Sequence, residues 1–198
     1  MHEADYTREN RHDCKGGAPM MKEQIEKLSW WHVITFPDGT VTPGRCDYRQ
    51  EEHSKRFQLP EDMTGLNVLD LGTFDGYWAI EAKKRGADVV AADRWEPMLE
   101  TAKLALGSFG IPYCWLGDLD KTSNANWMHG MFDIVLFYGI LYHLKNPYEG
   151  MLNAARFLKP GGRLFLESAV NQGKMAGLSS EIPLLWVIDE VHLGYRDW

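Results

Sequence analysis

Apolar residues gather into short runs at regular intervals from residue 67 onward. Five runs have the length and composition of buried strands: residues 68–71, 88–92, 113–116, 132–138 and 163–167. Helical patterns lie between them, at residues 77–85, at 97–110 and at 147–158, where a Lys-Pro-Gly-Gly run stops the last helix. Alternating strands and helices predict one α/β domain with a Rossmann-like, doubly wound and mostly parallel sheet.

The chain before this pattern has a different character. Residues 1–19 are polar and show no apolar period, which predicts a flexible arm. Residues 20–64 form an N-terminal extension, in which a short amphipathic helix precedes an aromatic segment and a strong turn signal at residues 37–40. A hairpin or ordered loop is expected there, and the main domain is expected over residues 65–198.

Composition narrows the functional classes. The formal charge of −7 leaves no global basic field, so nucleic acid is disfavoured as a substrate, although a local patch at residues 83–85 remains. No apolar run reaches the roughly 18 residues of a membrane span, and the N-terminal segment lacks a signal-peptide core. A soluble, cytoplasmic protein is therefore expected. No metal is expected either, because His2, His12 and Cys14 are better explained as a solvated tail than as ligands.

The segment Val68–Gly76 carries the chemistry, together with Asp93 about twenty residues later. It has the pattern of a strand, a glycine turn and a helix start, followed by a strand that delivers a carboxylate beside the turn. In an open α/β sheet, this arrangement holds an adenosine-containing cofactor at the carboxyl ends of the strands.

Two residues of the turn distinguish between cofactors. A dinucleotide fingerprint needs a glycine where this chain has Phe74, and Asp75 would repel a pyrophosphate at close range. S-adenosylmethionine carries no phosphate, and its α-amino group needs acceptors such as the carboxylates of Asp70 and Asp75. The turn therefore favours S-adenosylmethionine.

The other expected contacts follow the strand ends. Asp93 is suited to accept hydrogen bonds from both ribose hydroxyls, and Asp118 is placed to meet the exocyclic amine of adenine. Tyr77 is close enough to the turn to touch the methionine moiety. The complete set of expected cofactor-binding residues is Asp70, Gly72, Thr73, Phe74, Asp75, Gly76, Tyr77, Asp93, Arg94, Asp118, Leu119, Tyr138 and Gly139.

The order of these motifs resembles a class I S-adenosylmethionine-dependent methyltransferase, over residues 30–167. Within that superfamily, the segment 139–144, followed by Asn146-Pro147, is similar to the branch of the tRNA wobble-uridine carboxymethyltransferases and their relatives. Segment 30–44 resembles the extension that precedes the core in those relatives. The resemblance implies methyl transfer from S-adenosylmethionine.

Two features depart from that resemblance. No lysine-rich segment matches the one that binds a carboxylated cofactor in the wobble-uridine enzymes, so ordinary S-adenosylmethionine is expected. The superfamily sheet adds two strands after the fifth, whereas residues 184–188 supply at most one here, which implies a shortened C-terminal end. The run 182–188 is too apolar for a free tail and is expected to pack or to form an interface, in a homodimer or a hetero-complex.

Two groups of residues are candidates for catalysis. His143, just beyond the fourth strand, is the first candidate general base, with a purely structural role in its loop as the alternative. Tyr142 beside it has the same two interpretations, catalysis or core packing. His32, with Asp47 and Tyr48, forms the second group if the extension closes over the cofactor as a lid.

The lid has its own alternative, in which Trp30, Trp31 and Phe36 only hold the extension on the sheet. The leading hypothesis is a methyltransferase that acts on an oxygen or nitrogen nucleophile of a small-molecule acceptor. An RNA-modifying methyl or carboxymethyl transferase is the alternative, and it predicts a basic groove with steep salt dependence. A non-catalytic, cofactor-binding subunit is the third.

Overall fold

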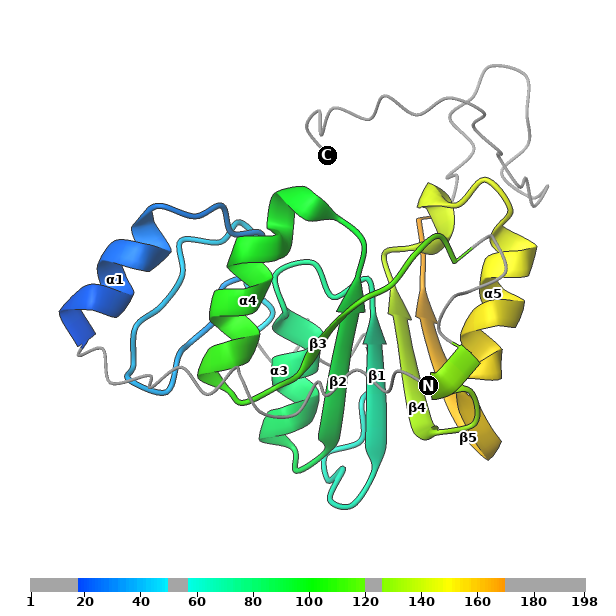
Figure 1. Ribbon diagram of the computed structural model, residues 1–198. Coiled ribbons are helices and arrows are strands. Elements are labelled where there is room, and N and C mark those ends of the chain that lie inside the picture. Colours follow the sequence, from blue (N-terminus) through cyan, green and yellow to red (C-terminus); the bar gives the residue numbers. More distant parts are fainter. Residues whose placement is uncertain (1–17, 50–56, 120–125, 170–198) are drawn as a thin grey trace, which may run out of the picture.

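The computed structural model of the 198-residue chain describes residues 18–49, 57–119 and 126–169. Its centre is a sheet of five parallel strands in the order β3-β2-β1-β4-β5 (Figure 1). The strands are β1 (Asn67–Leu71), β2 (Asp88–Asp93), β3 (Tyr113–Trp115), β4 (Phe132–Tyr138) and β5 (Leu158–Glu167). The strand order reverses between β1 and β4, the place where open α/β sheets bind their ligands.

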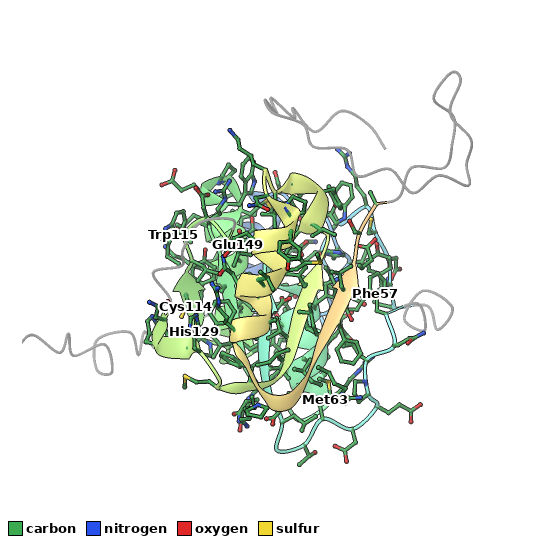
Figure 2. The ribbon with its side chains drawn as sticks, turned by 90° about the vertical axis from the view of Figure 1, so that its right-hand side faces the viewer. Phe57, Met63, Cys114, Trp115, His129 and Glu149 are labelled. Carbon is green, nitrogen blue, oxygen red and sulfur yellow. The ribbon has the colours of Figure 1, made fainter. Side chains whose placement is uncertain are left out.

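Helices cover both faces of this sheet. They are α1 (Ala18–Glu26), α3 (Tyr77–Lys84), α4 (Leu99–Ser108) and α5 (Pro147–Arg156), with the 3₁₀ turns η1 (Glu96–Met98), η2 (Asn126–Met128) and η3 (Leu141–His143). α3 and α4 share one apolar core with the extension, and α5 packs in a second core. Figure 2 shows α5 on one side of the sheet and Phe57 on the other. The predicted doubly wound α/β fold is confirmed.

The transition from α5 to β5 differs from the sequence prediction. The helix was expected to reach Leu158 but ends at Arg156, and Leu158 already pairs with Phe132 of β4. The register then shifts, so that the next paired residue of β5 is Arg163. The Lys-Pro-Gly-Gly run is therefore an irregularity within β5, because a Pro-Gly pair can stand in an edge strand at a bulge as well as in a turn.

The extension folds as predicted into a helix and a hairpin-like loop. The backbone N–H of Phe36 donates to the Thr40 carbonyl at 2.8 Å, which closes the turn. Trp30 and Phe36 are buried and meet edge to face, with 5.9 Å between ring centroids, in the core shared with α3 and α4. These two rings therefore hold the extension against the α3/α4 face. Figure 1 shows the extension beside α4.

Asp133 closes the opposite end of the sheet. Its Oδ2 accepts from the backbone N–H of Asn67 at 2.9 Å and from Lys159 Nζ at 2.7 Å. The bond from Lys159, followed by that from Asn67, lowers the pKa of Asp133. Asp133 thus joins β1, β4 and β5 far from the predicted site.

Two further expectations concern membrane-spanning helices and the two ends of the chain. Among residues 18–49, 57–119 and 126–169, no helix has both the length and the apolar composition needed to cross a bilayer. The predicted arm, up to residue 17, and the apolar run 182–188 lie outside the described residues.

Candidate functional site

The turn after β1 is pinned to the end of β2. The backbone N–H groups of Gly72 and Thr73 both donate to the carbonyl of Ala92, at 2.8 and 3.2 Å. Gly72 has φ +64°, and a Cβ at this position would lie 2.8 Å from the side chain of Ile140, in the loop after β4. The positive φ and the close Ile140 side chain both favour glycine there. The turn therefore contacts β2 and the loop after β4.

Asp93 fixes the other half of the turn. Phe74 has φ +54°, a left-handed conformation that costs a non-glycine residue about 1–2 kcal/mol, and its N–H donates to Asp93 Oδ2 at 2.8 Å. Asp93 Oδ1 accepts from the N–H groups of Arg94 and Trp95, at 2.6 and 2.8 Å. Because a carboxylate has about four acceptor positions, Asp93 keeps capacity for a ribose hydroxyl.

Asp70 lies beneath the turn and is 2% exposed. Its Oδ2 accepts from Thr73 Oγ1 at 2.7 Å and from the N–H of Ala79 at 3.1 Å. Burial, partly opposed by the bond from Thr73, raises the pKa of Asp70 to about 7. A nearby ammonium group would favour the ionised carboxylate, so the position suits the predicted contact with a methionine α-amino group.

A pocket of about 460 Å³ opens next to Asp93, where β2 and β3 end. Two indole rings line it and are well exposed, Trp95 at 43% and Trp115 at 56%. Arg94 and Asp118, also in the lining, form an ion pair. Figure 2 shows Trp115, at the end of β3, well away from Met63, which precedes the start of β1. Aromatic faces beside an acceptor carboxylate suit a purine ring.

A second aromatic group forms where the extension meets α3 and the end of β4. Tyr48 stacks on Trp78 and contacts Tyr77, with centroid distances of 5.6 and 5.7 Å. Phe57 lies between Trp78 and Tyr138, at 4.0 and 5.1 Å, and its carbonyl accepts from Tyr138 Oη at 2.9 Å. Burial raises the pKa of both Tyr77 and Tyr138. These two residues are therefore neutral phenols at physiological pH.

Asp75 is fully buried and ties the extension to the turn. Its Oδ2 accepts from the N–H groups of Trp31 and His32, at 3.0 and 2.7 Å, and its Oδ1 lies 2.6 Å from His32 Nδ1. The imidazole stacks on Tyr77, with 4.8 Å between centroids. The sequence grouped His32 with Asp47, but the carboxylate on its ring belongs to Asp75. The predicted contact between Asp75 and the cofactor stays a prediction.

The loop after β4 carries the other catalytic candidates. Gly139 donates its N–H to Glu167, to the carbonyl at 3.2 Å and to Oε2 at 3.1 Å. Tyr142 is 45% exposed and is therefore not a core residue; its ring lies 4.3 Å from that of His143. Within the described segments, no hydrogen bond holds the ring of His143. Surrounding protein atoms, and to a smaller extent Arg94, lower its pKa.

The predicted residues thus fall into groups around one turn. The structure adds two pocket-lining residues that the sequence analysis did not indicate. Trp95 and Trp115 were missed, although each stands at or just beyond the end of a strand that delivers a predicted contact. Leu119 is buried, and its carbonyl accepts from Asn153 Nδ2 at 2.6 Å. In the described part of the chain, no cluster of three or more His, Cys, Asp or Glu side chains could hold a metal ion.

Comparison with known proteins identifies the class. A family model described as "Methyltransferase domain" matches residues 69–166. The ubiquinone biosynthesis O-methyltransferase of Proteus mirabilis is 27% identical over 85% of this chain and 66% of its own length. The protein of the same name from Cereibacter sphaeroides is 26% identical over 91% of this chain and 74% of its own length. Residues 69–166 thus form a methyltransferase domain of the class I S-adenosylmethionine-dependent superfamily, and the cofactor of this domain is S-adenosylmethionine.

A solved structure agrees with the fold. Phosphoethanolamine N-methyltransferase 1 of Haemonchus contortus, solved with phosphoethanolamine and S-adenosylhomocysteine, superposes with a TM-score of 0.50 at 21% identity. The match covers 65% of this chain and 28% of that enzyme. The chain thus spans 66% and 74% of the two curated relatives and a smaller share of this one.

The residues present fit the cofactor. The turn at 72–76 has no basic side chain, and carboxylates stand at the ends of β1 and β2. The pocket next to Asp93 offers aromatic faces for adenine. When bound, S-adenosylmethionine supplies a methyl group that its sulfonium makes electrophilic. The protein must then hold an acceptor in line with that methyl group and exclude water.

Proposed function

We propose that this methyltransferase transfers the methyl group to a hydroxyl oxygen on a small aromatic acceptor. The observation that carries the proposal is the wall beside the cofactor turn, where the extension places aromatic side chains over the start of α3 and the end of β4. Neutral, buried phenols at Tyr77 and Tyr138 suit a planar organic acceptor better than a phosphate backbone. The names of the curated relatives, ubiquinone biosynthesis O-methyltransferases, support oxygen as the nucleophile.

The N-terminal extension, residues 20–64, acts as the cover of this site in our proposal. Asp75 fastens the extension to the cofactor turn, and Tyr48 lies against α3. A fixed cover would align the acceptor with the methyl group, and alignment accounts for much of the acceleration in such a displacement. It would also keep water out of the site.

An RNA acceptor is the second candidate. The segment 139–144 and the extension resemble the tRNA wobble-uridine branch, which supports a nucleic-acid substrate. The net charge of −7 opposes it, because RNA binding draws on a basic surface. A cytoplasmic location and an interface through residues 182–188 likewise remain proposals.

A labelled-methyl assay tests the acceptor class. Purified protein is incubated with S-adenosylmethionine carrying a radioactive methyl group, and with 3,4-dihydroxybenzoate, 4-aminobenzoate or bulk tRNA in parallel. We expect label in the dihydroxybenzoate as a methyl ether, and none in the amine or the tRNA. Label in tRNA that falls steeply with salt would replace the proposal by the RNA alternative.

A further inference from the structure

We propose that His32, oriented by Asp75, is the general base: its Nε2 takes the proton of the acceptor hydroxyl during methyl transfer. The inference rests on the proposed function, because only a nucleophile that carries a proton needs a base. His32 comes from the extension and Asp75 from the cofactor turn, so the pair is complete only when the extension is in place.

The backbone of His32 is held independently of its ring. Its N–H donates to Asp75 Oδ2 at 2.7 Å, and its carbonyl accepts from Thr42 Oγ1 at 2.7 Å. Gly44 approaches so closely that a Cβ there would collide with the carbonyl of His32. The main chain is therefore fixed without any contribution from the imidazole. The ring contact with Asp75 is an additional feature, which a merely structural tie would not need.

The Asp75 contact sets the tautomer of the imidazole. Asp75 Oδ1 lies 2.6 Å from Nδ1 and, as a carboxylate, can only accept. Nδ1 then carries the hydrogen, and a neutral ring keeps its lone pair on Nε2. This is the arrangement that an aspartate imposes on the histidine of a catalytic triad.

Nε2 is available to accept a proton. Within residues 18–49, 57–119 and 126–169, Nε2 of His32 has no hydrogen-bond partner, and no buried side-chain nitrogen or oxygen lacks one. Since about 10% of the His32 side chain is exposed, the two observations together place Nε2 at an accessible surface. Nε2 is thus not sealed inside the core.

The ring is seated on the cofactor turn itself. Asp75 belongs to the turn, and Tyr77, on which the imidazole stacks, is the first residue of α3. The ring of Tyr48 is tilted relative to the His32 imidazole, with 5.4 Å between the two centroids. Tyr48 in turn contacts Phe57, and Phe57 contacts Tyr138 at the end of β4. His32 therefore stands with the aromatic wall between α3 and β4, apart from the pocket that suits adenine.

His143 is a weaker choice for this role. No carboxylate or other hydrogen-bond partner orients its ring in the described part of the chain. Crowding by protein atoms and the charge of Arg94 lower its pKa, which makes it a poorer proton acceptor. His32 has the orienting carboxylate that His143 lacks.

Few other groups near His32 can titrate. Its ring faces the Asp75 carboxylate and the phenols of Tyr48 and Tyr77, and Cys46 pairs with it across a backbone bridge. Burial raises the pKa of both Tyr77 and Cys46, so that these two stay neutral at physiological pH. Asp70, beneath the same turn, has its pKa raised to about 7 by burial, so the test of His32 uses the acidity of the acceptor and not the pH of the medium.

The step balances without any other reactant. The acceptor oxygen bonds to the methyl carbon, the carbon–sulfur bond breaks with its electron pair going to sulfur, and the hydroxyl proton goes to His32 Nε2. The resulting imidazolium is stabilised by the Asp75 carboxylate and returns its proton to solvent after product release.

Two variants separate the base from the structural tie. His32→Asn keeps an N–H that can donate to Asp75 but removes Nε2. Asp75→Asn keeps an oxygen for the two backbone N–H groups, while its amide donates to Nδ1 and moves the ring hydrogen to Nε2. We expect each to lower kcat on 3,4-dihydroxybenzoate about 100-fold or more. In His32→Asn, whose side chain is not an expected cofactor contact, the Kd of S-adenosylhomocysteine should change by less than about twofold. His129→Asn, an exposed histidine elsewhere, is the matched control and keeps full activity.

The acidity of the acceptor hydroxyl distinguishes a general base from a structural residue. Loss of a base matters less for an acidic hydroxyl, whereas loss of a structural contact lowers the rate on every acceptor alike. In 4-nitrocatechol the nitro group makes the hydroxyl ionise near neutral pH, so this acceptor needs little help from a base. We expect the defect of His32→Asn to shrink at least about tenfold on 4-nitrocatechol. Equal defects on both acceptors would reduce His32 to a structural tie.

Nitrogen-15 NMR of the histidine rings keeps the two proposals distinguishable. The resonance lost in His32→Asn should show a hydrogen on Nδ1 and a bare Nε2, and the Nε2 signal should shift when S-adenosylhomocysteine is added. If those signals appear but no hydroxylated acceptor is methylated, the acceptor proposal fails and the base assignment stands. If the acceptor is methylated and His32→Asn matches the wild type, or if Nε2 carries the hydrogen, the base assignment fails alone.

Discussion

The buried carboxyl of Asp70 titrates near neutral pH. Its pKa of about 7 in the folded protein compares with 3.8 for an ordinary aspartate, mainly because burial disfavours the charge. Between these two values, the folded chain holds a proton that the unfolded chain has released. The stability that this proton provides is therefore full below about pH 4 and is lost as the pH rises toward 7.

Asp70→Asn should remove this dependence, because an amide oxygen can still accept from Thr73 and Ala79 but does not titrate. We expect the free energy of unfolding of Asp70→Asn, minus that of the wild type, to increase from pH 5 to pH 8, measured by urea unfolding at both values. Asp133→Asn is the control. The pKa of Asp133 is lowered, so its effect is constant over this range. A constant difference for Asp70→Asn would contradict the assignment.

At the scale of elements, the two aspartates at the ends of β2 have different surroundings. Asp88 begins the strand, is largely exposed and pairs with Lys83 at 3.9 Å. Asp93 ends it and accepts from three backbone N–H groups of the turn and the following loop. Parallel strands direct their carboxyl ends to the same edge, so Asp93, unlike Asp88, lies at the edge where open α/β sheets bind their ligands.

Asp93→Asn should therefore weaken cofactor binding. The amide removes the negative charge and one acceptor oxygen, and the loss of a charge-assisted hydrogen bond is worth about 1.5–3 kcal/mol, or roughly 10- to 150-fold in Kd. Calorimetry with S-adenosylhomocysteine measures the change. Asp88→Asn, at the other end of the strand, should leave the Kd unaltered. Equal affinities for the two variants would exclude Asp93 as the ribose acceptor.

The sequence predicted most elements because apolar periodicity and glycine position are local properties. The strands and helices of the domain, the glycine turn and the position of Asp93 at the end of β2 all followed from short segments. The Asp75–His32 pair could not be predicted, since its residues lie 43 positions apart and meet only through tertiary packing. The helix end at Arg156 was missed for a similar reason: pairing of Leu158 with Phe132 starts β5 early.

At the scale of the whole molecule, the extension belongs to the same core as the sheet. Ile25, Trp30 and Ile34 are buried together with residues of β1, α3 and α4 in a single cluster. Asp75 adds polar bonds between the extension and the turn. The extension and the sheet should therefore unfold as one cooperative unit.

Thr42→Val tests this cooperativity. Thr42 Oγ1 accepts from the Ile34 N–H at 2.8 Å and donates to the His32 carbonyl at 2.7 Å, both buried inside the extension. Valine has the same shape but leaves both groups unpaired, at a cost of about 2 kcal/mol or more. Because the extension shares the core, we expect the main urea transition to move to a lower midpoint with an unchanged slope. Thr40→Val, in the exposed turn nearby, is the control and should leave the midpoint in place. A separate early transition in Thr42→Val, with the main one unmoved, would show instead that the extension unfolds independently of the sheet.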